Sequence, residues 1–422
     1  MDTTATRHTG DAPPLSGLTV VDWTHVLAGP VTSYNLAVLG ARVIRIESVQ
    51  GGDIIRMHSP DPALAAMEMG DAFVMQSAGK ESLSIDANDS EARAILERLI
   101  ARADVLVENF RPGKLAALGF DPQRLIRCYP QLIVCSVSGF GQQGEHAERP
   151  AYDHVIQAMS GMMDANADEQ GNPRRFGSPL IDYATGMQAT VAILAALARR
   201  SREESRECGE WLDVSLHSTA LALLTPAYAS HAVSGQARQR SRSTAFSGNP
   251  LSGTFATRDG FIAIVCNTRK QSGNFLRALR AAGLPRPQID QLEEFVESGQ
   301  VDSVHECLAK FLQQEPSCVW ENRLIDVDVP VATVVSPAQA YDLAGGGPYF
   351  WPKVRVPGKT GTEVRVPGAG FSSSRTLTPE LSAPPRRGEH SETILEELGM
   401  SEADIEGLQV RGAIHTADSK WS

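Results

Sequence analysis

The regular alternation of apolar strands and helices in the first third of the 422-residue chain constrains its fold more than any other feature. A helix is expected between the first two strands, because Pro30 stands near its first position and Gly40 follows its last. Since β-α-β order of this kind builds parallel sheets with helices on their faces, we predict an α/β fold. The buried strands are expected at Leu18–Asp22, Arg42–Glu47, Asp104–Val107 and Leu132–Val137.

The remainder of the chain divides by composition. A long helix is predicted from about Tyr183 to Arg200, followed by a strand at Glu210–Ser215 and an apolar helix to about Val233. The polar, basic stretch Ser234–Ser247 predicts a linker. Beyond it we expect a hairpin of Gly253–Thr257 and Phe261–Val265, short helices to about Asp326, a segment rich in Pro and Gly from Pro337, and terminal helices at Ser391–Leu398 and Ser401–Leu408.

Charge and composition exclude several classes of protein. The net charge is −11, from 39 Lys and Arg against 50 Asp and Glu, which excludes a broadly basic nucleic-acid binder. Hydrophobic residues make up 42% of the chain, which excludes a disordered protein. Six cysteines without a C-x-x-C pair predict reduced thiols in a cytoplasmic protein. The longest apolar run, Ala189–Ala198, is too short to span a bilayer, so no membrane association is expected.

One glycine-rich loop raises the alternative of an NAD-dependent oxidoreductase. Residues 139–144 match G-x-G-x-x-G after a predicted strand, and Asp164 lies further along the chain, where an acid would contact the ribose. The fingerprint requires a helix that holds the pyrophosphate at its N-terminus. Here Pro150 breaks any such helix, and Glu145 and Glu148 would repel phosphate. We therefore disfavour dinucleotide binding at this loop.

Short strings with a consistent order and spacing extend over nearly the whole chain. They are Thr24–Pro30 (THVLAGP), Leu39–Glu47, Lys80–Leu83, Asp104–Gly113 (DVLVENFRPG), Leu118–Phe120, Ser136–Gly141, Ala151–Asp153, Gly388–His390 and Ile394–Gly399. Together they resemble the class III CoA-transferase family of the CaiB/BaiF type, which also contains α-methylacyl-CoA racemases. The order of the strings carries this resemblance, because no single string is specific.

The resemblance implies both an architecture and a set of substrates. The expected architecture is a large Rossmann-like domain with a parallel sheet, built from residues 1–234 and a returning segment 336–422. A smaller α+β domain, residues 235–335, is inserted between these parts, and the family forms interlocked homodimers. The implied substrates are a coenzyme A thioester and a free carboxylic acid, with no metal and no permanently bound cofactor.

The predicted CoA site lies at the carboxyl edge of the sheet. Asn109–Gly113 follows a strand at this edge, where open α/β sheets bind ligands, and Arg111 offers phosphate a planar fork of donors. His25 precedes a helix N-terminus, which favours anions. By resemblance, the CoA contacts are His25, Leu27, Ala28, Arg56, Lys80, Asn109, Phe110, Arg111, Tyr152 and Asp153. A mobile substrate loop is implied by the same resemblance, with Gly248, Asn249, Ser252 and Gly253.

Asp182 is the predicted nucleophile. It stands just before the long helix, whose positive end is expected to keep the carboxylate ionised. The resembling family places its essential aspartate at this point, which implies CoA transfer through an aspartyl anhydride and an aspartyl-CoA thioester on Asp182. A dicarboxylic donor such as succinyl-CoA is a hypothesis that depends on nearby arginines, namely Arg174, Arg175, Arg238, Arg240 and Arg242.

One position separates transfer from the alternative of an α-methylacyl-CoA racemase, in which Asp182 would act as an acid/base. The racemase branch carries histidine where this chain has Tyr152, and a phenol with a pKa of about 10 carries protons poorly at neutral pH. Transfer is therefore favoured. Formyl-CoA-type transferases carry glutamine where this chain has Leu27, which favours a larger or less polar acyl group here.

Overall fold

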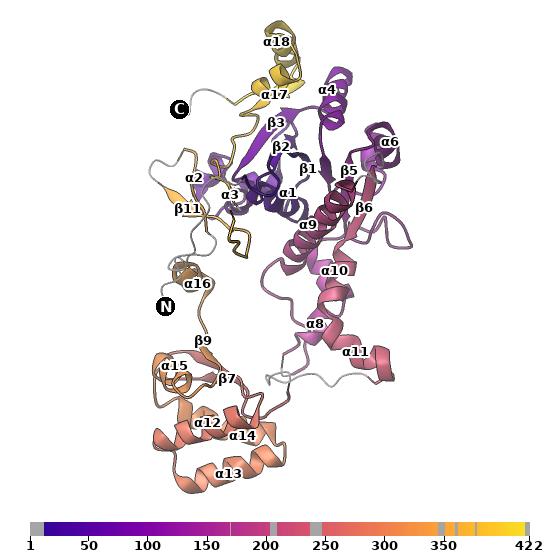
Figure 1. Ribbon diagram of the computed structural model, residues 1–422. Helices are drawn as coiled ribbons and strands as arrows, with labels where there is room; N and C mark the ends of the chain where they lie inside the picture. The colour runs from indigo at the N-terminus through magenta and orange to yellow at the C-terminus, as the bar shows by residue number, and fades with distance from the viewer. Residues whose placement is uncertain are drawn as a thin grey trace. The chain divides into compact units, whose positions relative to one another are not determined.

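The computed structural model describes residues 12–168, 170–202, 209–236, 247–344, 351–358, 362–375 and 378–417. The chain forms two compact units, and Figure 1 shows their elements. The first unit contains two separate stretches, Met1–Ala229 and Gly347–Ser422, and the second contains Ser230–Gly346.

A seven-stranded sheet forms the centre of the first unit. Its strand order is β12-β3-β2-β1-β4-β5-β6, in which β1 to β6 are parallel and β12 is antiparallel to β3. This confirms the predicted parallel sheet, and it adds two strands that were not predicted, β3 and β12. The bounds are β1 Thr19–Trp23, β2 Arg42–Glu47, β3 Lys80–Ile85, β4 Val105–Glu108, β5 Ile133–Ser138, β6 Glu210–Ser215 and β12 Ile414–His415.

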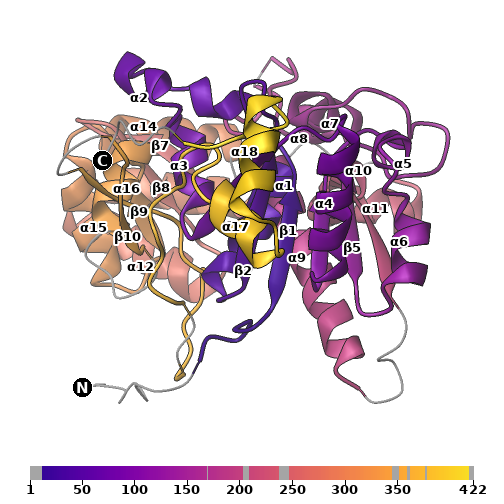
Figure 2. The same ribbon diagram turned by 90° about the horizontal axis from the view of Figure 1, so that it is seen from above.

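Helices cover both faces of this sheet because alternate side chains of each strand point to opposite faces. On β1, Val21 packs into one core with α4, α17 and α18, whereas Val20 packs into the other with α1, α9 and α10. Figure 2 shows α4, α17 and α18 in front of the strands. The bounds are α1 Ala28–Val38, α4 Ser90–Ala101, α9 Leu180–Arg200, α10 Leu216–Leu223, α17 Ser391–Glu397 and α18 Glu402–Val410.

The smaller elements of the first unit complete the connections between strands. They are η1 Ile54–Met57, α2 Pro62–Ala66, α3 Asp71–Ser77, α5 Lys114–Ala117, α6 Pro122–Cys128, α7 Asp153–Met159, α8 Met162–Ala165, β10 Lys353–Arg355 and β11 Glu363–Arg365. The apolar helix that was predicted to run to Val233 is divided, because α10 ends at Leu223 and α11, Thr225–Ser234, begins beside Pro226. Proline lacks the N–H that a continuous helix needs and favours a new first turn.

Two helices of the first unit, α1 and α9, run side by side in the same direction. A Cβ atom on Gly186 would lie 2.6 Å from Val31 Cγ1 and 2.9 Å from the Ala28 carbonyl oxygen, so the two backbones approach closely. One turn later, Asn35 Nδ2 donates to Thr190 Oγ1 at 3.2 Å. From the first contact to the second, the residue numbers rise along both helices. The helices are therefore parallel, and the N-termini of α1 and α9 lie at the same end.

The second unit has its own core beneath a small antiparallel sheet. The predicted hairpin is confirmed, since β7, Gly253–Ala256, pairs with β8, Phe261–Ile264. Its remaining elements are α12 Arg269–Ala281, α13 Arg286–Glu297, α14 Val301–Leu312, α15 Ser317–Ile325, β9 Val331–Thr333 and α16 Pro337–Ala344. Most of the predicted linker Ser234–Ser247 lies outside the described residues.

Candidate functional site

In the sheet, β2 and β3 lie on one side of β1, and β4, β5 and β6 lie on the other, so the order of the strands switches between β1 and β4. Hydrogen bonds join the loops that follow these two strands. Asn109 Oδ1 accepts a hydrogen bond from the His25 N–H at 3.0 Å, and Asn109 Nδ2 donates to the His25 carbonyl at 2.8 Å. An asparagine side chain thus continues the pairing of the two strands beyond their carboxyl ends. Open α/β sheets bind ligands in the crevice at such a switch point, so the site is built upward from here.

The Asn109–Gly113 loop is anchored by aromatic packing and by one carboxyl group. The Phe110 ring lies 5.6 Å from the Trp23 ring and 5.8 Å from the His25 ring, measured between centroids. The Phe110 N–H donates to Glu108 Oε2 at 2.8 Å. Burial raises the pKa of Glu108 to about 7. Arg111 itself is exposed, which leaves its guanidinium accessible to a phosphate.

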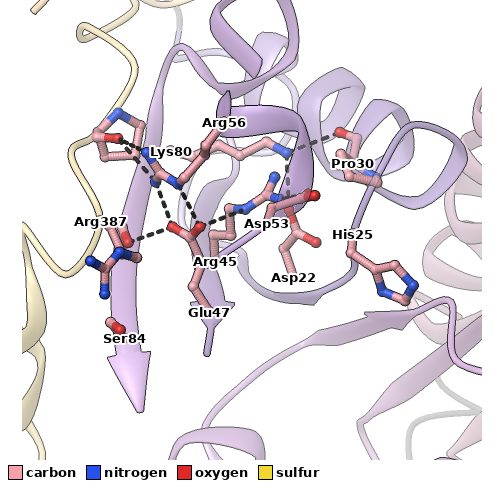
Figure 3. Close-up of polar contacts among 12 residues, drawn as sticks. Asp22, His25, Pro30, Arg45, Glu47, Asp53, Arg56, Lys80, Ser84 and Arg387 are labelled. Carbon is pink, nitrogen blue, oxygen red and sulfur yellow. Dashed lines mark hydrogen bonds and ion pairs between the residues drawn. The ribbon is translucent and has the colours of Figure 1, made fainter. Parts of the chain in front are cut away.

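Lys80 and Arg56 lie in the interior and are bound to acidic groups, as Figure 3 shows. Lys80 Nζ donates to Asp22 Oδ2 at 2.9 Å, and Arg56 donates to both Glu47 oxygens at 2.7 and 2.6 Å. A CoA phosphate would have to displace these buried carboxylates, which is costly. Their predicted contact with CoA is therefore disfavoured by the structure, which gives both cations a role in the fold.

These two cations belong to a buried cluster of six charges. Its members are Asp22, Arg45, Glu47, Asp53, Arg56 and Lys80. Three formal positive charges face three negative ones, so the cluster is balanced. Burial alone would lower the pKa of Lys80, and the carboxylate of Asp22 opposes this, leaving the pKa at about 8. Figure 3 shows that the His25 ring points away from the cluster.

Asp182 lies within the first turn of α9, because the helix begins at Leu180 and not at Tyr183 as predicted. The residue that caps this helix is Asp153, which lies at the start of α7. Asp153 Oδ2 accepts from the Ile181 N–H at 2.8 Å and from the Asp182 N–H at 3.4 Å. Because Asp153 supplies the cap, the Asp182 carboxylate is not needed for capping this helix.

The expectation that the helix end keeps Asp182 ionised needs correction. Burial, together with the charge of Asp153, raises the pKa of Asp182 to about 7. Within the described residues, no cation forms an ion pair with this carboxylate. Desolvation and a like charge therefore outweigh the helix dipole, whose effect in the first turn is modest. A carboxylate that is poorly solvated and unpaired is a reactive one.

Gln157 was not predicted, and it links Asp153 to the segment that leads into α9. Its Nε2 donates to Asp153 Oδ1 at 2.6 Å, and its Oε1 accepts from the Phe176 N–H at 2.9 Å. The i, i+4 spacing of Asp153 and Gln157 on α7 is the sequence signal that could have revealed this pair. The neighbouring Tyr152 is 73% exposed.

Two helix N-termini meet beside Asp182. Leu27 stands at the N-cap of α1 without a side-chain hydrogen bond to the first turn, and Ala28 is the first helical residue. Because α1 and α9 are parallel and packed at Gly186, one turn from Asp182, their positive ends face the same region. The first N–H groups of α9 are already bonded, two of them to Asp153, so the N-terminus of α1 is the end suited to an anion such as the oxyanion of an acyl-transfer intermediate.

The other predicted residues fall elsewhere. In the second unit, Ser252 is buried and its Oγ accepts from the Cys266 N–H at 2.8 Å, while Asn249 Nδ2 donates to Ser272 Oγ at 3.0 Å. Gly248 has a positive φ of 69° and Gly253 begins β7. The role of this loop in substrate binding stays a prediction.

Of the five arginines predicted near the substrate, two lie on the surface and three lie outside the described residues. Arg174 and Arg175 are exposed in the segment before α9, and Arg174 forms an ion pair with Asp168 at 3.2 Å. The other three, Arg238, Arg240 and Arg242, lie outside the described residues. The G-x-G-x-x-G loop is followed by turns through Pro150, and the next helix starts at Asp153, so no helix N-terminus is present for a pyrophosphate.

Known proteins with similar sequences and folds agree with this geometry. The model of CoA-transferase family III matches residues 15–391. The chain is 30% identical over 416 residues to mouse (Mus musculus) succinyl-CoA:glutarate CoA-transferase, covering 96% of this chain and 92% of the relative. It is 34% identical over 338 residues to acetyl-CoA:oxalate CoA-transferase of Acetobacter aceti, covering 78% and 83%.

A solved structure supports the same assignment. The crystal structure of a CaiB/BaiF family protein from Brucella suis superposes with a TM-score of 0.78 at 28% identity, covering 92% of this chain and 100% of that one. The matched region includes the strands, α1 and α9 that build the site. The chain is therefore a CoA-transferase and belongs to CoA-transferase family III.

Proposed function

We propose that this enzyme moves CoA from an acyl-CoA donor to a free carboxylic acid, with Asp182 as the covalent nucleophile. The observation that carries the proposal is the state of the Asp182 carboxylate, which is partly buried, has no cationic partner among the described residues and lies one turn from the contact of α9 with the start of α1. With a pKa raised to about 7, the group is ionised at mildly alkaline pH. Poor solvation then increases its nucleophilicity.

The first half of the reaction frees the donor acid. An oxygen of Asp182 attacks the thioester carbonyl, the carbon–sulfur bond breaks, and CoA thiolate leaves behind a mixed anhydride. The thiolate then attacks Cγ of Asp182, the anhydride carbon–oxygen bond breaks, and the donor carboxylate leaves. The enzyme now carries an aspartyl-CoA thioester, and no proton has been gained or lost.

The second half reverses these steps with the acceptor. A carboxylate oxygen of the acceptor attacks the aspartyl thioester and releases CoA thiolate, which then attacks the acceptor carbonyl of the new anhydride. The new acyl-CoA departs and the Asp182 carboxylate is restored. Each attack builds a negative oxygen, and the positive end of α1 is suited to stabilise it.

A dicarboxylic acid is the substrate class that we infer. The two relatives described above are named for succinyl-CoA with glutarate and for acetyl-CoA with oxalate. In this chain Arg175 is exposed in the segment that leads into α9, five residues before Leu180 begins the helix. An arginine so placed would pair with the second carboxylate of a substrate such as succinyl-CoA.

We further propose a homodimer, supported by an uncovered apolar face. Leu180, Met187 and Val191 are 39%, 62% and 58% exposed and lie on one side of α9, at helical spacing. By length and composition alone α9 would also pass as a membrane span, but its other side packs against α1 and the sheet. A second copy of the chain would cover the exposed stripe.

The dimer is tested by light scattering after gel filtration. Val191→Glu should shift the mass toward that of a monomer, because it places a charge within the stripe. Gln188→Glu changes the charge on the same helix but beside the stripe, and it should leave the mass unchanged. A parent protein that runs as a monomer at micromolar concentration contradicts the proposal.

The transfer itself is tested by incubating the enzyme with succinyl-CoA and a panel of free acids, including glutarate, oxalate and acetate. Mass spectrometry should show new acyl-CoA products, with dicarboxylic acceptors preferred. Hydroxylamine added during turnover should leave a hydroxamate on the peptide that contains Asp182. If no acid accepts CoA, while the α-carbon of a branched acyl-CoA takes up deuterium, the enzyme is a racemase and the proposal is wrong.

A further inference from the structure

Val26 has a backbone conformation that a valine avoids. Its φ is +68°, and among the described residues only two other non-glycine positions, Glu68 and Asp328, share a positive φ. In this region the side chain of an L-residue crowds its own carbonyl, and branching at Cβ makes the conflict worse. Val26 lies between His25 and Leu27, in the segment that enters α1.

Distant side chains hold this conformation from both sides. The Val26 N–H donates to Asp53 Oδ2 at 2.9 Å, and the Val26 carbonyl accepts from Gln76 Nε2 at 2.7 Å. Together with the two bonds from Asn109 to His25, every backbone polar group of these two residues is bound by a side chain from another segment. We call residues 25–28 the strap.

The residues that hold Val26 are themselves fixed in the interior. Asp53 and Gln76 are 4% and 2% exposed, and Asp53 forms an ion pair with the fully buried Arg45. Gln76 Oε1 is buried and has no hydrogen-bond partner among the described residues, although buried polar atoms normally have one. Strain at Val26 and an unsatisfied acceptor at Gln76 therefore occur together, beside the predicted CoA contacts. Strain of this kind collects at functional sites.

We propose that Asp53 and Gln76 are positioning residues for the CoA substrate, which act by holding Val26 in its left-handed conformation. The bend at Val26 separates the His25 ring, which faces away from the charged cluster in Figure 3, from the N–H groups at the start of α1, which the N-cap residue Leu27 does not cap with its side chain. With the bend preformed, both elements of the strap are in place before CoA arrives, and less ordering is needed on binding. This inference rests on the proposed function, because it assigns the strap to the same substrate.

The experiment measures CoA affinity by calorimetry and splits kcat from KM for succinyl-CoA. Asp53→Ala should weaken CoA binding about tenfold and raise KM more than it lowers kcat. Adding Val26→Gly should recover most of that loss, since glycine adopts a positive φ without strain. Adding Asp328→Gly instead is the matched control, and it should recover nothing because Asp328 is a positive-φ residue in the other unit.

Asp53→Ala removes the ion-pair partner of the buried Arg45, and a second pair of variants avoids this side effect. Gln76→Met removes the donor to the Val26 carbonyl without creating an unpaired ion, and Val26→Gly should again recover the affinity. The proposal is overturned if glycine at 26 rescues neither variant, or if both bind CoA as the parent does. If the parent binds CoA but transfers it to no acid, the proposed function fails while the affinity series still decides the role of the strap.

Discussion

Two regions at the carboxyl edge of the sheet shift the pKa of a buried carboxylate in opposite directions. In the six-charge cluster, burial would raise the pKa of Glu47, but the guanidinium groups of Arg56 and Arg45 overcome this and lower it to about 2. At the start of α9, burial acts on Asp182 without such compensation, and the charge of Asp153 adds to it, so the pKa rises to about 7. The same desolvation thus has opposite outcomes, depending on whether a cation is present.

Under the proposed function, this difference separates a structural carboxylate from the nucleophile. Glu47 accepts two bonds from Arg56 and one from Ser82 Oγ, so its lone pairs are occupied. The polar groups around Asp182 instead bond to Asp153, which caps the helix in its place. The fold neutralises three buried acids with three cations, yet no cation of the described residues pairs with Asp182, as the proposed attack on a thioester requires.

The largest effect is expected from Asp182→Asn. The amide cannot form the anhydride, so transfer should fall by at least about a thousandfold. The melting temperature should stay the same or rise, because a poorly solvated charge has been removed. Initial rates of acyl-CoA exchange and a thermal melt measure both quantities. A variant that retains transfer within tenfold of the parent contradicts the assignment of the nucleophile.

A substitution in the six-charge cluster should change the stability of the fold and not the transfer reaction. Arg56→Met leaves Glu47 buried without its main partner, which should lower the free energy of unfolding by about 3–5 kcal/mol. Urea denaturation measures the loss. The matched control is Arg111→Met, an exposed arginine whose removal should change stability by only about 0.5 kcal/mol. Equal losses from both variants would show that the cluster contributes no special stabilisation.

The two regions should also give opposite pH dependence of stability. Glu47 has a lowered pKa, so its stabilisation is present above its unfolded pKa and disappears as the pH falls toward 2. Asp182 has a raised pKa, so it destabilises the fold increasingly as the pH rises from about 4 to 7. Asp182→Asn should therefore stabilise the protein by about 1–2 kcal/mol more at pH 8 than at pH 5. Denaturation at both pH values tests the sign, and Asn109→Ala serves as a control without a titrating group.

The sheet and its ligand-binding edge were predictable because their signals are local. Strands β1, β4 and β5 are mostly apolar, and β2 carries the β-branched residues Val43, Ile44 and Ile46. Helix α1 has its proline and glycine at the expected ends. β3 was missed because Lys80, Ser82 and Ser84 interrupt its apolar pattern. These polar groups are buried only because distant partners satisfy them, among them the Ser391 side chain, which binds the Ser84 N–H.

The electrostatic character of the site was not predictable for the same reason. From the sequence alone an arginine is expected at the surface, and only the fold shows that Arg56 pairs with Glu47. Asp182 was predicted to be the nucleophile by resemblance, and its ionisation was predicted from the helix dipole alone. The opposing effect of Asp153 depends on a contact across 29 residues, which no local pattern encodes.

The smallest expected effect comes from removing the negative charge of Asp153 beside Asp182. Asp153→Asn keeps an acceptor for the Ile181 N–H but removes the negative charge that helps to raise the pKa of Asp182. In the parent, kcat/KM should rise about tenfold per pH unit below 7 and level off above it, because that ratio reports the free enzyme. In the variant the midpoint should move down by about one unit. An unmoved midpoint would mean that burial alone sets the pKa, and that the two regions differ by the missing cation only.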